Sequence, residues 1–175
     1  MAGYRLKNGK QLIVRRASVG DAEVIVDTVN QVASEEAYLL WDKTPYNVEV
    51  ERKYIAKANE TGNALILVAE VDGRVMGVGE LKIGEFRKNR HTAELGITLL
   101  KEFRRLGVGS ALMEEMIRWA KEKQLEKICL SVFSTNGSAI ALYRKFGFEV
   151  EAVRKKQFKT EKGYVNEILM AKFLV

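Results

Sequence analysis

An apolar run, a basic turn with two glycines and an amphipathic segment follow one another near the middle of the chain. Residues 92–100 are mostly apolar and predict a strand, and Arg104-Arg105-Leu106-Gly107-Val108-Gly109 predicts a turn. Residues 110–122 keep their charged side chains on one arc at about 100° per residue, which indicates an α-helix. This order places backbone N–H groups at a helix N-terminus, where unpaired amides and the helix dipole attract anions. We therefore predict a phosphate-binding turn, to which Arg104 and Arg105 add mobile positive charge.

The chain has 175 residues, of which 47% are hydrophobic and 30% charged, and its net charge is +6. These values are typical of a folded domain, which we place over residues 1–175. The positive charge favours phosphate-bearing ligands. However, Lys and Arg are scattered among acidic residues and form no stripe, so we expect no nucleic-acid partner.

Cys129, the only cysteine, lies in an apolar run and predicts a buried, unreactive thiol. A single cysteine allows no disulfide within the chain, which is compatible with the cytoplasm, where we place the protein. The first residues have no signal-peptide core, and no apolar run approaches the length of a membrane span, so we expect no membrane partner. No cluster of Cys and His residues indicates a metal site.

Turn and cap signals divide the first part of the chain. Asn8-Gly9 lies between two strand-like segments and predicts a hairpin with a two-residue turn. Ser18 and Asp21 resemble a capping box before a helix over residues 22–33. Asn47 predicts the cap of a second helix that ends at about residue 59. The inward face of this second helix is predicted to carry Val50, Tyr54, Ile55 and Ala58.

The second part alternates strand-like and helical segments. Residues 64–71 and 74–81 predict two strands joined by the Asp72-Gly73 turn. Three further strands (127–133, 148–158 and 164–173) and a short helix over residues 138–145 complete the order. This order predicts an α/β fold with one mixed, mostly antiparallel sheet and helices on both faces. The strands over residues 92–100 and 127–133 are predicted to be parallel and to separate around a ligand.

Two common phosphate motifs do not fit the glycine pair. A P-loop requires Gly-Lys-Ser/Thr, and Gly109-Ser110 lacks the lysine. The dinucleotide fingerprint requires a third small residue where Leu112 stands, and an acidic residue at the end of the next strand, where Phe133-Ser134 occurs. The pattern that remains is Arg-x-x-Gly-x-Gly.

With this pattern the chain resembles the GNAT superfamily of acyl-CoA-dependent N-acetyltransferases, whose signature is Gln/Arg-x-x-Gly-x-Gly/Ala after the fourth core strand. A second family feature is an Asn after the next strand, followed by a helix that ends Tyr-x-x-x-Gly-Phe. Here these residues are Asn136 and Tyr143 to Phe148. The resemblance covers about residue 12 to the C-terminus and implies a GNAT fold as a single domain.

The resemblance implies direct transfer of acetyl from acetyl-CoA to an amine, without a covalent enzyme intermediate. It implies that the turn amides hold the pyrophosphate and that the preceding strand pairs with the pantetheine arm. The Asn136 side chain would bind the cofactor arm. The residues assigned to acetyl-CoA are Ile97, Thr98, Leu99, Arg104, Arg105, Leu106, Gly107, Val108, Gly109, Ser110, Asn136 and Ser138.

Two residues are candidates for proton transfer. By the resemblance, Tyr143 faces the CoA sulfur and acts as general acid; alternatively, it packs the short helix with its hydroxyl bonded to backbone. Glu94, a carboxylate in an apolar strand, is the candidate base if partial burial raises its pKa. Alternatively, Glu94 is a surface residue of an alternating strand that shares one face with Thr92 and Gly96. His91 stands at the start of that strand and is expected to have a surface role.

The acceptor amine is left open between a small molecule and a protein N-terminus. Glu80 and Glu85 are candidates for binding its positive charge, and a loop with Glu35, Glu36, Trp41 and Asp42 would form a wall of the acceptor site. Two other classes remain: a catalytically weak acyl-CoA-binding or sensory module with the same fold, and a nucleic-acid-binding α/β domain. Exposed sheet edges make a homodimer plausible.

Overall fold

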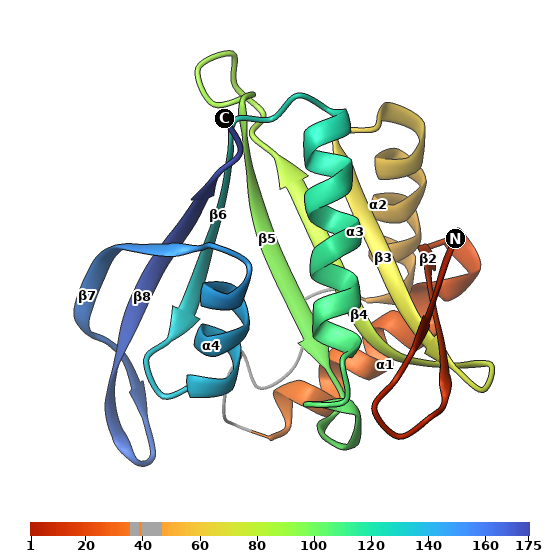
Figure 1. Cartoon of the computed structure of the whole chain (residues 1–175), viewed down its shortest axis with the longest axis horizontal. Helices are drawn as coiled ribbons and strands as arrows, with labels where there is room; N and C mark the ends of the chain where they lie inside the picture. The colour runs from red at the N-terminus through yellow and green to blue at the C-terminus, as the bar shows by residue number, and fades with distance from the viewer. Residues whose placement is uncertain (36–38, 40–46) are drawn as a thin grey trace. The chain divides into compact units, whose positions relative to one another are not determined.

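The computed structural model describes residues 1–35, 39 and 47–175. Figure 1 shows the course of the chain. The strands are β1 (Ala2–Arg5), β2 (Gln11–Arg16), β3 (Ala64–Val71), β4 (Arg74–Ile83), β5 (Thr92–Leu99), β6 (Lys127–Phe133), β7 (Glu149–Thr160) and β8 (Gly163–Phe173). The α-helices are α1 (Ala22–Ala33), α2 (Val48–Thr61), α3 (Val108–Glu122) and α4 (Gly137–Lys145), and two short 3₁₀-helices are η1 (Val19–Asp21) and η2 (Lys101–Phe103).

Hydrogen bonding links the strands in the order β1-β2-β3-β4-β5-β6-β8-β7. The sheet is mixed, with β5 and β6 as its parallel pair, so the predicted fold class is confirmed. The parallel register extends over only three residue pairs, Thr92–Glu94 with Lys127–Cys129. β6 then continues to Phe133 in antiparallel register with β8. No helix within the described ranges is both long enough and apolar enough to cross a membrane.

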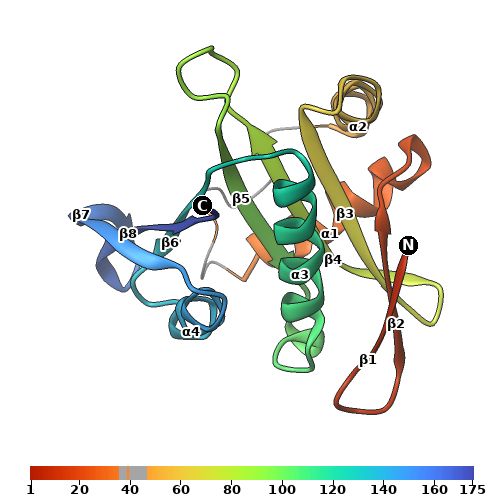
Figure 2. The same cartoon turned by 45° about the horizontal axis from the view of Figure 1, so that its top comes forward.

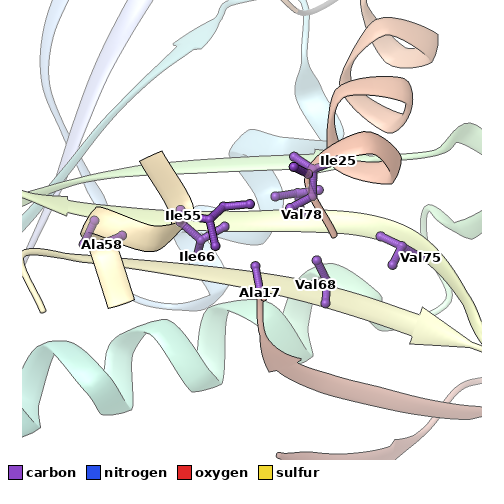
Figure 3. Close-up of a cluster of buried hydrophobic side chains, with 10 residues drawn as sticks. Ala17, Ile25, Ile55, Ala58, Ile66, Val68, Val75 and Val78 are labelled. Carbon is purple, nitrogen blue, oxygen red and sulfur yellow. The ribbon is translucent and has the colours of Figure 1, made fainter. Parts of the chain in front are cut away.

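The chain forms two compact units that are interleaved in the sequence, and the first comprises Met1–Lys82 with Gly96–Trp119. In this unit α1 and α2 lie on one face of the strands and α3 lies on the other (Figures 1 and 2). β3 is therefore covered on both faces, which explains why it is apolar except at Glu70. Figure 3 shows the cluster beneath α1 and α2, where Ile25 and Ile55 pack with Ile66, Val68 and Val78.

The second unit comprises Ile83–Leu95 with Ala120–Val175. Here β8 pairs with both β6 and β7 in antiparallel register. The rings of Phe133 and Phe158 stack with centroids 4.5 Å apart. Tyr143 and Phe148 are buried and their ring centroids lie 5.9 Å apart. Because Tyr143 comes from α4 and Phe148 precedes β7, this contact holds the helix against the chain that follows it.

Most predicted turns and caps are present. Asp72 and Gly73 both have positive φ, at 51° and 76°, as a two-residue type I′ turn requires. The Asn47 side chain accepts from the N–H of Val50 at 2.9 Å, which confirms the predicted cap of α2. Ser18 and Asp21 form the predicted capping box. Val50 itself is exposed, so its assignment to the inward face of α2 was wrong.

The first hairpin differs from its prediction in the length of its turn. The N–H of Leu6 donates to the carbonyl of Lys10, and the N–H of Gly9 donates to the carbonyl of Leu6, both at 2.9 Å. Gly9 has a φ of 84°. The loop is therefore a three-residue turn in which Gly9 takes the left-handed position, and the predicted two-residue turn was wrong.

Candidate functional site

The predicted phosphate-binding turn lies in the first unit, between β5 and α3. The N–H of Ala111 donates to the carbonyl of Gly107 at 3.1 Å, and this is the first bond of the α3 ladder. The N–H groups of Val108, Gly109 and Ser110 come before that bond, in the first turn of the helix. The strand, turn and helix predicted from the sequence are therefore present, with amides at the N-terminus of a 15-residue helix.

The backbone of this turn adopts two conformations that side chains rarely allow. Arg105 has a φ of 66° and Gly107 a φ of 111°. The φ angle therefore changes sign between neighbouring residues from Arg104 to Gly107, and turns of this kind can point successive N–H groups toward an anion. The carbonyl of Leu106, which would repel an anion, accepts the N–H of Lys7 at 3.1 Å instead. Gly107 is thus required for its backbone angle and not only for its small size.

Arg104 and Arg105 differ sharply in their surroundings. Arg105 is exposed, as the prediction of mobile charge requires. Arg104 is fixed: its guanidinium forms an ion pair with Glu35, with N–O distances of 2.7 and 2.9 Å, and donates twice to the carbonyl of Leu99. The prediction that Arg104 adds mobile positive charge was therefore wrong, because a carboxylate 69 residues earlier in the chain neutralises it.

The end of β5, which the sequence analysis assigns to the pantetheine arm, is held against β4. Ile97, Thr98 and Leu99 are all half-buried. The Leu99 side chain lies over Gly77, where an added Cβ would come within 2.3 Å of Leu99 Cδ2. The N–H of Leu100 donates to the carbonyl of Met76 at 3.1 Å. Gly77 therefore permits the close approach that positions Leu99.

In the second unit, Asn136 caps α4. Its Oδ1 accepts from the N–H of Ala139 at 3.1 Å and from the hydroxyl of Ser138 at 3.2 Å. The carbonyl oxygen of the side chain therefore has a structural role at the helix N-terminus. The Nδ2 amide is the part of this side chain that remains as a donor for the predicted cofactor contact.

Tyr143 is 7% exposed, and burial raises the pKa of its phenol to about 12. The alternative role predicted its hydroxyl to be bonded to backbone. No such hydrogen bond of the hydroxyl is found within the described part of the chain. The side chain is therefore held by its ring, through Phe148, and its hydroxyl is protonated at neutral pH.

Glu94 lies opposite Cys129 in the parallel register of β5 and β6. Its side chain is exposed, so the partial burial expected for a catalytic base is absent. Cys129 was predicted to be buried and is half-buried, and burial raises the pKa of its thiol. His91 is exposed, and its carbonyl accepts the N–H of Glu126 at 2.8 Å. The charges of Glu94 and Glu151 both contribute to the raised pKa of Cys129, and Glu151 is itself paired with Lys127 at 2.6 Å.

Two groups of polar side chains, each built around a carboxylate, were not recognised in the sequence. In the first unit, the Tyr54 hydroxyl donates to Glu80, and Glu51 lies near enough for the Glu80 charge to contribute to its raised pKa, after burial. In the second unit, buried Glu167 accepts from the hydroxyl of Ser131 at 2.5 Å and pairs with Arg154 at 3.0 Å. Each cluster joins segments distant in the sequence, so no local motif could reveal it.

Some of the remaining acceptor-site candidates lie among the residues that the structure describes, and the others do not. Glu85 is exposed after β4. Glu35 is in place at the end of α1, whereas Glu36, Trp41 and Asp42 lie outside the described residues. Across residues 1–35, 39 and 47–175, no group of three or more His, Cys, Asp or Glu side chains is arranged to hold a metal ion.

Residues 27–148 match the acetyltransferase (GNAT) family. The L-amino acid N-acetyltransferase AaaT of Escherichia coli (strain K12) is 30% identical over 164 residues, which cover 93% of this chain and 98% of that protein. An N-alpha-acetyltransferase of Sulfurisphaera tokodaii is 33% identical over 171 residues, covering 91% of this chain and 93% of the relative. Among solved structures, that of yncA from Salmonella typhimurium with its cofactor acetyl-CoA has a TM-score of 0.85 at 21% identity, and the match covers 94% of both chains. The chain therefore belongs to the GNAT family and is an acetyl-CoA-dependent N-acetyltransferase.

Proposed function

We propose that this enzyme acetylates an α-amino group, that of an amino acid or of a protein N-terminus, in the cytoplasm. The observation that carries the acetyl-CoA part is the turn before α3, where the first N–H groups of the helix follow a backbone with positive φ at Arg105 and Gly107. The acceptor part rests on the relatives, which are an L-amino acid N-acetyltransferase and an N-alpha-acetyltransferase. Residues 1–175 act as one catalytic domain in this proposal.

The donor acetyl-CoA supplies an activated acetyl thioester. In the proposal, the N–H groups of Val108, Gly109 and Ser110 bind its pyrophosphate, and exposed Arg105 adds positive charge. The remaining assigned turn residues, Arg104, Leu106 and Gly107, shape this surface through their backbone. The backbone of Ile97–Leu99 pairs with the pantetheine arm as an added strand would. A backbone N–H near Leu99 then stabilises charge on the carbonyl oxygen.

The Nδ2 group of Asn136 and the hydroxyl of Ser138 are assigned to the cofactor arm. Since Oδ1 of Asn136 caps α4, the amide that remains has a fixed orientation. Because the Asn136 side chain is already ordered, its Nδ2 group can bind a carbonyl of the arm without a further loss of side-chain entropy.

An α-amino group has a pKa of about 8, against about 10.4 for a lysine side chain. It therefore loses its proton more easily, and an exposed carboxylate or a water held by it is a sufficient base. Glu94 is the proposed base for this step, directly or through water. The carboxylates of Glu51 and Glu80, together with the Tyr54 hydroxyl, are the proposed attraction for the positive charge of the acceptor.

Tyr143 is the proposed acid toward the leaving thiolate. Its phenol is protonated at neutral pH because burial raises the pKa to about 12. A thiol has a pKa of about 8.5, so complete proton transfer from such a phenol is uphill. The hydroxyl therefore stabilises the sulfur by donating a hydrogen bond as negative charge develops there.

The test is release of free thiol from acetyl-CoA with a panel of L-amino acids, peptides with free N-termini, polyamines and aminoglycosides. Turnover with amino acids or peptide N-termini, and not with polyamines or aminoglycosides, is expected. Acetylation confined to side-chain or polyamine nitrogens would contradict the acceptor class. Binding of acetyl-CoA without turnover on the whole panel would favour the alternative, a catalytically weak acyl-CoA-binding module.

A further inference from the structure

Glu35 and Arg104 join the end of α1 to the turn before α3. We propose that they form a positioning pair: Glu35 orients Arg104, and Arg104 fixes the Leu99 carbonyl at the strand end that binds acetyl-CoA. In this role the Arg104 side chain is not a phosphate ligand, although it is the first residue of the Arg-x-x-Gly-x-Gly motif. The inference rests on the proposed cofactor site.

The geometry of the pair is a two-pronged fork. Nη1 of Arg104 lies 2.7 Å from one carboxylate oxygen of Glu35, and Nη2 lies 2.9 Å from the other. Nε and Nη2 also donate to the carbonyl oxygen of Leu99, at 3.0 and 2.9 Å. A planar guanidinium can make these contacts together, whereas a lysine ammonium, a single point charge, cannot.

The carboxylate is itself anchored. The N–H of Glu35 donates to the carbonyl of Val32 at 3.2 Å, and the N–H of Ser34 donates to that of Asn30 at 3.0 Å, so the last turn of α1 holds the backbone of Glu35. The side chains of Arg104 and Glu35 are only 23% and 24% exposed. The pair is thus partly shielded from water, and its opposite charges cancel at the turn.

The Glu35–Arg104 pair acts on the end of β5 through one peptide group, the one that joins Leu99 to Leu100. Its oxygen, the Leu99 carbonyl, accepts from Arg104, while its N–H, that of Leu100, donates to the carbonyl of Met76. With both ends bonded, the plane of this peptide is fixed. The backbone of Ile97–Leu99 leads directly into it, so the orientation of groups assigned to the pantetheine arm depends on Arg104 and, one step away, on Glu35.

The two possible roles of Arg104 predict opposite results for Glu35→Gln. If Arg104 bound phosphate, loss of the neutralising carboxylate would free its positive charge, and acetyl-CoA would bind more tightly. If Arg104 is a positioning residue, its guanidinium loses the Glu35 carboxylate that orients it, and acetyl-CoA binds about tenfold more weakly. Arg104→Lys separates the roles in the same way, because it keeps the charge and loses the fork.

The experiment is calorimetric titration of acetyl-CoA into the wild type, Glu35→Gln, Arg104→Lys and the double variant. We expect about tenfold weaker binding for each single variant and no further loss in the double variant, since both break one unit. Glu35→Asp is expected to recover part of the affinity. Glu23→Gln, which changes an exposed carboxylate on α1, is the control and is expected to leave the affinity unchanged.

In Glu35→Gln and Arg104→Lys, the KM for acetyl-CoA is expected to rise in proportion to the dissociation constant of acetyl-CoA. The KM for the acceptor is expected to stay the same. A general loss of folding would change both and would lower the melting temperature of Glu35→Asp as much as that of Glu35→Gln. Unchanged or tighter acetyl-CoA binding in folded Glu35→Gln would overturn the inference.

Gly107→Val tells whether a negative result overturns only the positioning pair or also the proposed acetyl-CoA site. Its side chain would stand at a φ of 111°, so the turn must deform. If Gly107→Val leaves acetyl-CoA binding unchanged, the proposed cofactor site is wrong. If Gly107→Val weakens binding and Glu35→Gln does not, the site stands and the positioning pair is wrong.

Discussion

The backbone N–H of Lys7 donates to the carbonyl oxygen of Leu106 at 3.1 Å. This bond lets the first hairpin hold the turn before α3, although the hairpin lies outside residues 27–148, which match the GNAT family. A second contact joins the same elements, since the Tyr4 hydroxyl donates to Glu115 of α3 at 2.7 Å. The hairpin is therefore part of the structural support of the proposed cofactor site.

Lys7→Pro removes the donor to Leu106 and is expected to weaken acetyl-CoA binding by about fivefold, the effect of losing one backbone hydrogen bond. Lys7→Ala keeps the N–H and is the control. Equilibrium titration with acetyl-CoA checks both variants. If Lys7→Ala and Lys7→Pro weaken acetyl-CoA binding equally, the ammonium group of Lys7 is responsible. That result would contradict the role of the backbone hydrogen bond to Leu106.

Gly77→Ala is expected to displace Leu99, because the added Cβ would lie 2.3 Å from Leu99 Cδ2 and 3.1 Å from the carbonyl of Thr98. Overpacking of this kind typically costs about 1–3 kcal/mol of stability. The KM for acetyl-CoA is also expected to rise, since Thr98 and Leu99 are assigned to the pantetheine arm.

The control for this substitution is Gly96→Ala on β5, where an added Cβ meets nothing within 4 Å. Denaturant unfolding and initial rates at varied acetyl-CoA concentration measure the two effects. If Gly77→Ala unfolds at the same denaturant concentration as Gly96→Ala, the close approach of Leu99 to β4 is not a constraint.

Local signals explain why much of the fold could be predicted. The bounds of β3 and β6 agree with the predicted strands, because both are mostly apolar segments between polar turns. Asp72-Gly73 predicts its turn because both residues tolerate positive φ. Asn8-Gly9 carries the same signal but forms a longer turn. Leu6 pairs with Lys10, so Lys7 joins Asn8 and Gly9 in a three-residue loop.

The candidate site shows where such signals end. The motif predicts a helix N-terminus, because the glycines and the helical periodicity lie within a few residues of one another. The ion pair of Arg104 with Glu35 spans 69 residues, and the bond between Ser131 and Glu167 spans 36. Only the folded chain brings these residues together. Arg104 therefore looked like a free cation in the sequence and is a paired one in the structure.

Asp21 is expected to make stability depend on acid pH. Its pKa falls from 3.8 to about 2, first because Arg15 donates to it, against the opposing effect of burial, and also because Ser18 donates to it. Since the folded pKa is below the unfolded one, the contribution is present above pH 3.8 and is lost as the pH falls through 2. Its size is about 2 kcal/mol.

Asp21→Asn should therefore lower the free energy of unfolding at pH 7 and flatten its change between pH 4 and 2. Asp27→Asn, an exposed position on α1, is the control. Urea unfolding at several pH values measures the difference. A wild type and an Asp21→Asn variant with parallel profiles over this range would show that the Arg15–Asp21 pair does not titrate as described.

Tyr143→Phe is expected to lower kcat by about a hundredfold while leaving the dissociation constant of acetyl-CoA unchanged, because the hydroxyl acts as the sulfur becomes negative. Burial holds the pKa of this phenol at about 12, so the wild type should lose no activity through its ionisation until the pH approaches that value. Tyr164→Phe, on an exposed tyrosine, is the control. Steady-state rates and acetyl-CoA titration are measured for each variant. A rise in KM at unchanged kcat would mean that Tyr143 serves only to pack α4 against Phe148.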